Sequence, residues 1–207
     1  MSKDPQIDFT NAKQDRSKKT LDDLLQAAYA IVEAADPAEF TSRTLANKAG
    51  YSLGTLSRRL SSVQDVFFWA IQKGREIKIN EVSKEMIEFD PQSTIRDFVE
   101  RFISRAFANI NTVTPKVMRF YDDRYTKKYG LTTNYFDYID LMVEPYLETC
   151  RRNKTGTFRI LSKEEARLAF RAILMISERM FAQHDPIAGT AEHRRILVDL
   201  ATRMLAK

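Results

Sequence analysis

The sequence of 207 residues has few of the residues that build disulfide frameworks and metal clusters. Its single cysteine, Cys150, excludes an intrachain disulfide, and with only His184 and His193 beside it a structural zinc cluster has too few ligands. We expect Cys150 to be a packing residue rather than a reactive thiol. Glycine and proline are also scarce, at six each, which together with 43% apolar and 29% charged residues is typical of a helix-rich globular protein.

Long apolar runs and catalytic motifs are missing as well. No run approaches the roughly 18 apolar residues of a membrane span, and the polar N-terminus lacks the apolar segment of a secretory signal, so we expect a cytoplasmic protein that does not bind membranes. Enzyme function is one alternative, because Glu, His, Tyr and Cys all occur in the second half. However, the sequence has no phosphate-binding glycine loop, nucleophile elbow or metal-ligand spacing, and no carboxylate pair beyond the ordinary Asp122-Asp123. We therefore expect neither catalysis nor a metal or cofactor.

Positive charge is concentrated in two segments near the N-terminus. The segment between Thr41 and Leu60 contains no Asp or Glu and has a net charge of +4, from Arg43, Lys48, Arg58 and Arg59. A second cluster, with Lys13, Arg16, Lys18 and Lys19 against Asp15, has a net charge of +3. Either cluster alone is typical of a solvated surface, but the two together favour an anionic partner, most commonly nucleic acid.

Hydrophobic periodicity predicts an all-α fold, with strand signals nearly absent. The first helices are expected from Ser17 to Ala35 and from Thr41 or Ser42 to Ala49. Later helices are expected to follow Ser62 as far as Phe89 and to span Thr94 to Asn111, Pro115 to Tyr129, Thr132 to Asn153, Lys163 to Gln183, and Ala191 to Ala206. Pro145 should kink the helix that contains it near Leu141, because its ring removes a backbone hydrogen bond and crowds the preceding turn.

The segment AGYSLGTLSRRL, from Ala49 to Leu60, has the spacing of a helix-turn-helix. Gly50 suits the left-handed residue that ends one helix, and Ser52 suits the N-cap of the next. Leu56 and Leu60 lie four residues apart and should face inward, which leaves a polar and basic face outward. A second helix of this kind can enter the major groove of DNA.

This region resembles the TetR (tetracycline-repressor-like) family of transcription regulators. The residues that match the family's N-terminal pattern are Thr41, Leu45, Ala46, Ala49, Gly50, Ser52, Gly54, Leu56, Ser62 and Val66. The resemblance implies an N-terminal three-helix DNA-binding domain, residues 1–62 with a basic arm, joined by a long helix to a helical ligand-binding and dimerisation domain, residues 63–207. By position in the pattern, the residues expected to face DNA are Thr41, Arg43, Tyr51, Ser52, Leu53, Gly54, Thr55, Ser57, Arg58 and Arg59.

Four positions depart from that pattern, and Tyr51 is one of them, at a turn position that the family usually fills with Val. Ser57 stands where the family commonly has Tyr, Leu60 where it has Phe, and Val63 where it has Lys. The family's Tyr and Lys usually touch phosphates, so Arg58, Arg59 and the Tyr51 hydroxyl are candidates for replacement contacts. Arg43 and Arg58 are the best candidates for base contact, because a guanidinium can bridge guanine O6 and N7; for each, a surface residue without specific contact is the open alternative.

The last two predicted helices carry apolar residues on more faces than one subunit's core requires. The resemblance implies a homodimer in which these helices pair across a two-fold axis, and burial within one subunit is the alternative. The residues expected at the interface are Ile173, Ile176, Met180, Ile196, Leu197, Leu200 and Met204.

Aromatic and Met side chains recur at helical spacing in the second half. They are either core residues or the lining of a mostly apolar cavity for a hydrophobic or aromatic effector, with His184 as a further polar anchor. The candidate lining residues are Phe98, Phe102, Met118, Tyr121, Tyr125, Tyr135, Tyr138, Met142, Tyr146, Phe170, Leu174 and Glu178. The sequence thus favours a repressor that binds a palindromic operator in double-stranded DNA and is released by this effector. The alternative is a TetR-like protein-interaction or nucleoid-associated module without specific operator binding.

Overall fold

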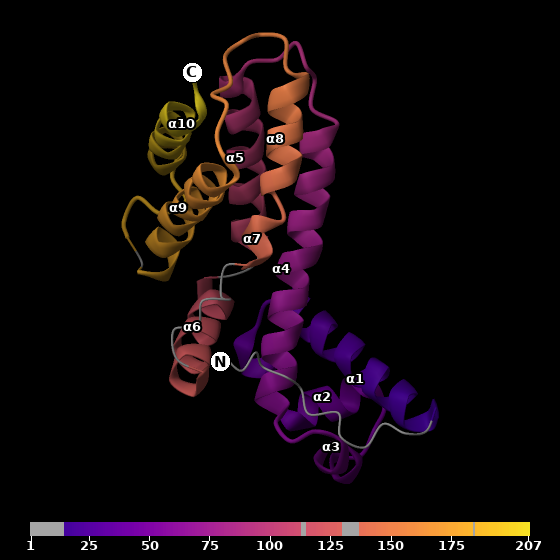
Figure 1. Cartoon of the computed structure of the whole chain (residues 1–207). Coiled ribbons are helices and arrows are strands. Elements are labelled where there is room, and N and C mark those ends of the chain that lie inside the picture. The colour runs from indigo at the N-terminus through magenta and orange to yellow at the C-terminus, as the bar shows by residue number, and fades with distance from the viewer. Residues whose placement is uncertain (1–14, 113–114, 130–136, 184) are drawn as a thin grey trace. The chain divides into compact units, whose positions relative to one another are not determined.

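A computed structural model describes residues 15–112, 115–129, 137–183 and 185–207, and in these ranges it confirms the predicted all-α fold (Figure 1). None of the described helices combines the length and apolarity needed to cross a bilayer. The elements are α1 (Asp15–Glu33), the 3₁₀ turn η1 (Pro37–Glu39), α2 (Ser42–Ala49), α3 (Leu53–Arg59), α4 (Val63–Ile87), α5 (Ile95–Thr112), α6 (Pro115–Tyr129), α7 (Asp137–Asp140), α8 (Val143–Arg152), α9 (Lys163–Ala182) and α10 (Ala191–Leu205).

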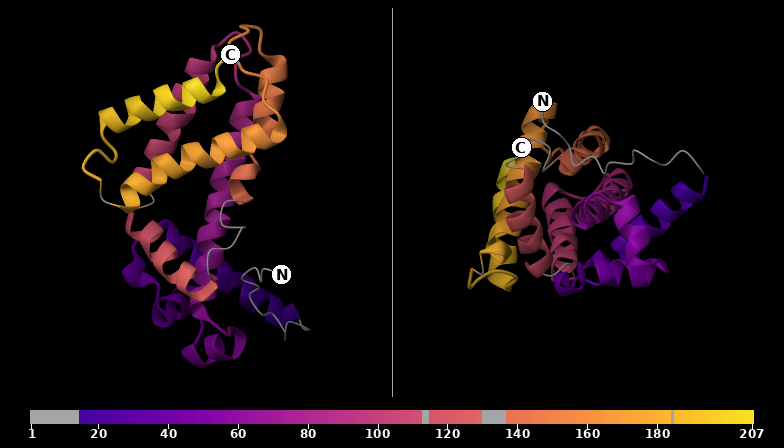
Figure 2. Two further views of the ribbon diagram at one scale, coloured as in Figure 1. Left: turned by 60° about the vertical axis from the view of Figure 1, so that its left-hand side comes forward. Right: turned by 90° about the horizontal axis from the view of Figure 1, so that it is seen from below.

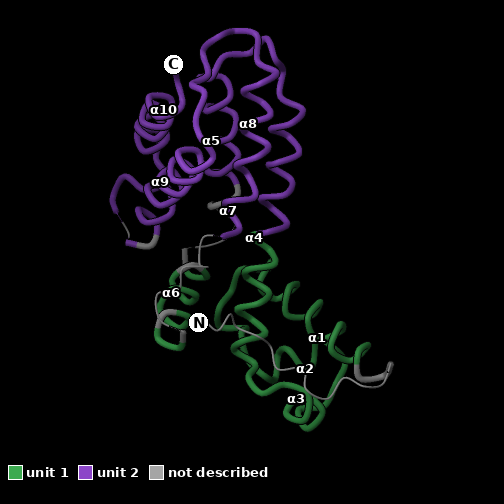
Figure 3. The backbone as a smooth tube through the Cα atoms, viewed as in Figure 1, with its two compact units in different colours: residues 1–75, 116–134 green, residues 76–115, 135–207 purple. Residues whose placement is uncertain are grey.

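The chain forms two compact units, which Figure 3 distinguishes by colour. Unit 1 consists of residues 1–75 and 116–134, and unit 2 consists of residues 76–115 and 135–207. Helix α4 therefore contributes residues to both units. The functional division expected after residue 62 stays a prediction, but the compact units place α6 and the first half of α4 with the N-terminal helices.

Unit 1 is built around the apolar faces of α1 to α4. Leu24 of α1 and Leu45 of α2 are fully buried, and Leu56 of α3 and Val66 of α4 are buried with them. Buried residues recur every three or four positions along a helix, which places them on one side of it. The opposite side of α2 and α3 therefore remains in solvent.

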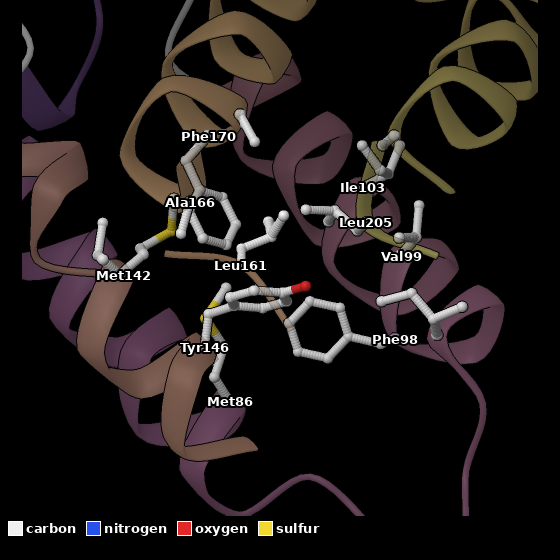
Figure 4. Close-up of a cluster of buried hydrophobic side chains, with 14 of the residues drawn as sticks. Met86, Phe98, Val99, Ile103, Met142, Tyr146, Leu161, Ala166, Phe170 and Leu205 are labelled. Carbon is white, nitrogen blue, oxygen red and sulfur yellow. The ribbon is translucent and has the colours of Figure 1, made fainter. Parts of the chain in front are cut away.

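Unit 2 has a second core, formed by α5, α8, α9, α10 and the end of α4. Helices α9 and α10 form an antiparallel hairpin, and α10 packs along α5 (Figures 1 and 2). Aromatic rings fill the centre: Phe98 of α5 lies 5.8 Å from the ring of Tyr146 on α8, which lies 5.3 Å from Phe170 on α9 (Figure 4). The segment after α8 closes this core through Phe158, which is buried and forms an isolated antiparallel bridge with Ala206.

The expected helix from Thr132 to Asn153 is wrong as one continuous element. Its first residues lie outside the described ranges, and the rest is divided into α7 and α8 at Leu141–Met142. Pro145 is the third residue of α8, where a helix has no intrahelical partner for the backbone N–H, so the missing donor costs nothing there. The interruption falls near Leu141, where the kink was predicted, but Pro145 stands at the start of a new helix rather than within a continuous one.

Candidate nucleic-acid interface

The turn between α2 and α3 has the backbone that the sequence predicts. Gly50 has φ +75° and ψ +27°, the left-handed conformation, and its N–H donates to the carbonyl of Asn47 at 3.2 Å. The Tyr51 N–H donates to the Ala46 carbonyl at 2.9 Å, which satisfies another carbonyl at the end of α2. A side chain at Gly50 would meet no steric obstacle but would be strained by the positive φ, so the requirement for glycine lies in the backbone.

Side-chain caps fix where α2 and α3 begin. The Thr41 hydroxyl accepts a hydrogen bond from the Thr44 N–H at 3.1 Å, and the Ser52 hydroxyl accepts one from the Thr55 N–H at 3.1 Å. Leu56 and Leu60 are buried, as the spacing predicted. Caps, turn and buried leucines together orient α3 so that one face packs on α2 and the other is free.

The structure brings the residues expected to face DNA together on the exposed side of α2 and α3. Leu53 is 47% exposed, while Thr55 and Arg59 are half-buried. The other members on these helices and their caps are exposed, namely Thr41, Arg43, Ser52, Gly54, Ser57 and Arg58. No carboxylate occurs between residues 41 and 60, although the exposed Glu39 accepts a hydrogen bond from the Thr44 hydroxyl at 3.2 Å. The net charge of residues 41–60 is positive and favours an anionic partner.

Two side chains on α3 bond back to their own helix. The Arg58 Nε donates to the Gly54 carbonyl at 3.1 Å, and the Ser57 hydroxyl donates to the Leu53 carbonyl at 3.1 Å. Both bonds lie at the solvent-exposed surface, where water can replace them. A rotation of the Arg58 side chain is therefore enough to direct its guanidinium outward.

The Tyr51 hydroxyl has a different partner from the phosphate expected for it. It donates to the Asp23 carboxylate at 2.6 Å, which ties the turn to α1, and this hydrogen bond to a carboxylate raises the pKa of Tyr51. A phosphate contact through the same oxygen requires this bond to break. The geometry favours Tyr51 as a residue that positions the turn.

We predict that Tyr51→Phe lowers the melting temperature and leaves affinity for DNA within about twofold of the parent, as for a substitution remote from the ligand. Asp23→Ala is the matched control, because it removes the same hydrogen bond from the other side. Thermal unfolding and fluorescence anisotropy measure the two quantities. Should the hydroxyl contact phosphate instead, Tyr51→Phe alone weakens binding and lowers the salt slope by about 0.9.

The structure places the candidate pocket residues in two different cores. Tyr121 and Tyr125 belong to unit 1, where their rings pack against Phe68 at 5.5 and 5.4 Å. The members in unit 2 lie in or against the central cluster, namely Phe98, Phe102, Tyr138, Met142, Tyr146, Phe170 and Leu174, and Glu178 is half-buried on α9. Tyr135, His184 and the side chain of Met118 lie outside the described residues, as do Lys13 and the side chain of Arg16 from the N-terminal basic cluster.

The residues expected at a dimer interface differ in how far they are exposed to solvent. Leu197 is fully buried in its own subunit, because the face of α10 that carries it packs on α5, so Leu197 is a core residue rather than an interface residue. Ile176 on α9 and Leu200 on α10 are each 38% exposed. The remaining members, Ile173, Met180, Ile196 and Met204, are half-buried.

The chain is similar to the crystal structure of a protein from Mesorhizobium loti MAFF303099 that is assigned to the TetR family of transcriptional regulators. The two structures superpose with a TM-score of 0.63 over 94% of this chain and 100% of that one, at 14% sequence identity. The chain has the TetR fold. No protein-family model and no curated protein matches the sequence. The TetR fold is thus established by the structure, in agreement with the resemblance in residues 41–66.

Sequence reasoning did not assign α6 to the helix-turn-helix unit. The signal that was available is the apolar spacing of Val117, Tyr121 and Tyr125, all buried, on a helix that is otherwise strongly charged. That spacing predicts one buried face but does not identify the helices that cover it. In the TetR fold of this chain, the first half of α4 covers it.

Proposed function

We propose that this protein is a homodimeric DNA-binding transcription regulator whose operator affinity is lowered by a hydrophobic or aromatic effector, and that it acts as a repressor. The observation that carries the DNA-binding role is the exposed polar and basic face of α3, held by its cap at Ser52 and by the buried leucines Leu56 and Leu60. A helix presented in this way matches the recognition helix of a helix-turn-helix. The neighbour's assignment to a transcriptional regulator family supports the same role.

The effector site is proposed within the aromatic core of unit 2. Tyr146 is fully buried there, and among the described residues its hydroxyl has no nitrogen or oxygen partner, although it interacts with the Cys150 thiol one helical turn away. Burial raises the pKa of Tyr146 well above its ordinary value, so the hydroxyl stays protonated and can donate. In Figure 4 the ring lies between Leu161 and Phe98. An aromatic effector with one acceptor atom would satisfy this hydroxyl and pack against the surrounding rings.

The test is selection of DNA by the protein itself. Random duplexes of about 30 base pairs, long enough for two half-sites one or two helical turns apart, are enriched on the purified protein. The expected result is a palindromic sequence bound by a dimer, with affinity that falls steeply from about 50 to 200 mM salt. Enrichment of no sequence, with salt-sensitive binding to any duplex, favours the nucleoid-associated alternative. Absence of all DNA binding favours a protein-interaction module.

A further inference from the structure

Helix α6 is part of the DNA-binding unit although it lies far from it in sequence. Residues 116–134 form one compact unit with α1, α2, α3 and the first half of α4 (Figure 3). Tyr121 is fully buried, and its hydroxyl accepts a hydrogen bond from the Gln72 amide of α4 at 2.5 Å. The Arg75 guanidinium lies 4.9 Å from the centre of the same ring. These contacts fix the position of α6 on α4.

One flank of α6 lies beside the start of α2. Phe120 packs edge-on against Phe40, with 4.9 Å between ring centres, and Phe40 stacks on Phe67 of α4 at 4.7 Å. Phe40 directly precedes Thr41, the N-cap of α2 and one of the residues expected to face DNA. The flank of α6 that carries Phe120 is therefore adjacent to the candidate DNA surface.

The C-terminal end of α6 lies beside the start of α4. The Lys128 ammonium donates to the Ser62 hydroxyl at 3.2 Å and forms an ion pair with Asp65 at 2.5 Å. Ser62 follows α3 by only a few residues, since Leu60 is the C-cap of that helix. The first turn of α4 itself contains no cation, as it reads Val-Gln-Asp from residue 63. The cation that pairs with the first turn of α4 therefore comes from α6.

The charge of α6 is concentrated in the half nearest to these contacts. The helix carries five basic and two acidic residues, and after Asp123 every charged residue is basic. Arg124, Lys127 and Lys128 are all exposed, and Arg124 is held over the ring of Phe120 at 4.7 Å from its centre. The helix dipole favours cations in the last turn of any helix. It does not account for the attachment of this basic end to α2 and α4.

We propose that the basic C-terminal turns of α6 bind the phosphate backbone of the DNA that α3 reads, and so extend the interface beyond the helix-turn-helix. Arg124 lies on the flank adjacent to α2, and Lys127 is exposed in the last turn, which Lys128 holds to the start of α4 through Asp65. Arg124 and Lys127 therefore extend the positive charge of residues 41–60. The occupant is duplex DNA because its phosphates are closely spaced along the groove edges, and sequence-independent contacts of this kind position a reading helix. The inference rests on the proposed DNA-binding function.

The test compares two double variants that remove equal charge. Arg124→Gln with Lys127→Gln removes two cations from α6 and leaves the Lys128–Asp65 pair in place, and Lys84→Gln with Lys154→Gln removes two exposed cations from unit 2. Each lost phosphate contact reduces the salt slope by about 0.9, so the α6 pair should lower the slope by about 2 per subunit and weaken binding about tenfold at low salt. The probes are the duplex enriched by the parent and a random duplex of equal length. The α6 double variant should lose affinity for the two duplexes by the same factor.

Lys127→Glu alone is the safeguard against a folding defect, because it leaves the Lys128–Asp65 pair in place. It should weaken binding to both duplexes with an unchanged melting temperature. The inference is overturned if the α6 variants bind DNA with the parent's affinity and salt slope. It is also overturned if the unit 2 double variant loses as much affinity for DNA as the α6 double variant. If the parent protein binds no duplex, the proposed function itself is refuted. If the parent and the α6 variants bind DNA equally well, only the extension to α6 is refuted.

Discussion

Arg58→Ala is expected to weaken binding to the selected operator about 30-fold or more, since a bidentate contact to guanine contributes about 1–3 kcal/mol in each subunit of a dimer and 1.4 kcal/mol corresponds to tenfold. Arg58 is exposed in the last turn of α3, on the face opposite to the buried Leu56. In the free protein its Nε bonds to the Gly54 carbonyl, an exposed contact that water can replace when the guanidinium turns toward a base.

Two further variants separate base reading from charge. Arg58→Lys keeps the charge but loses the planar pair of donors, so it should keep affinity for random duplex and lose affinity for the operator. Arg101→Ala, at an exposed position on α5 in unit 2, removes a charge without touching the helix-turn-helix and should bind as the parent does. Fluorescence anisotropy titrations with both duplexes over a salt series measure the ratio of operator affinity to random-duplex affinity for each variant. Unchanged operator affinity and salt slope in Arg58→Ala would remove Arg58 from the interface.

The helix-turn-helix could be predicted closely because its determinants are local. Thr41, Gly50 and Ser52 act through their own backbone and that of residues two to four positions away, so their residue types are enough to place the ends of α2 and α3. The burial of Leu56 and Leu60 follows from the spacing of a single helix. Nothing distant in the sequence had to be known.

The features that could not be predicted depend on long-range packing. Whether Leu197 faces its own core or a partner is decided by α5, which packs on that side of α10. The Tyr51 hydroxyl finds Asp23, 28 positions earlier. Periodicity gives the direction of an apolar face but not its neighbour, and for this reason the aromatic residues of α6 and of unit 2 looked like one set from the sequence alone.

Ile176→Glu combined with Leu200→Glu is expected to convert the dimer into a monomer and to weaken operator binding about 100-fold or more, because the second half-site contact is then no longer intramolecular. Each side chain is 38% exposed in one subunit, on α9 and α10 respectively. Leu168, also on α9, is 59% exposed. An apolar side chain gains from burial against a partner, whereas a glutamate there would have to lose its hydration on dimerisation.

The prediction assumes that the exposed faces of α9 and α10 form the dimer interface. Ile160→Glu is the control variant for this assumption. Ile160 is 91% exposed, just before α9, so the same kind of charge is introduced outside the proposed interface and should leave a dimer with the parent's affinity. Sedimentation velocity at micromolar protein gives the mass, and circular dichroism verifies that the helices and melting transition remain. A dimer that persists in the Ile176 and Leu200 double variant would place the interface elsewhere. A folded monomer that still binds operator as tightly as the parent would separate recognition from dimerisation.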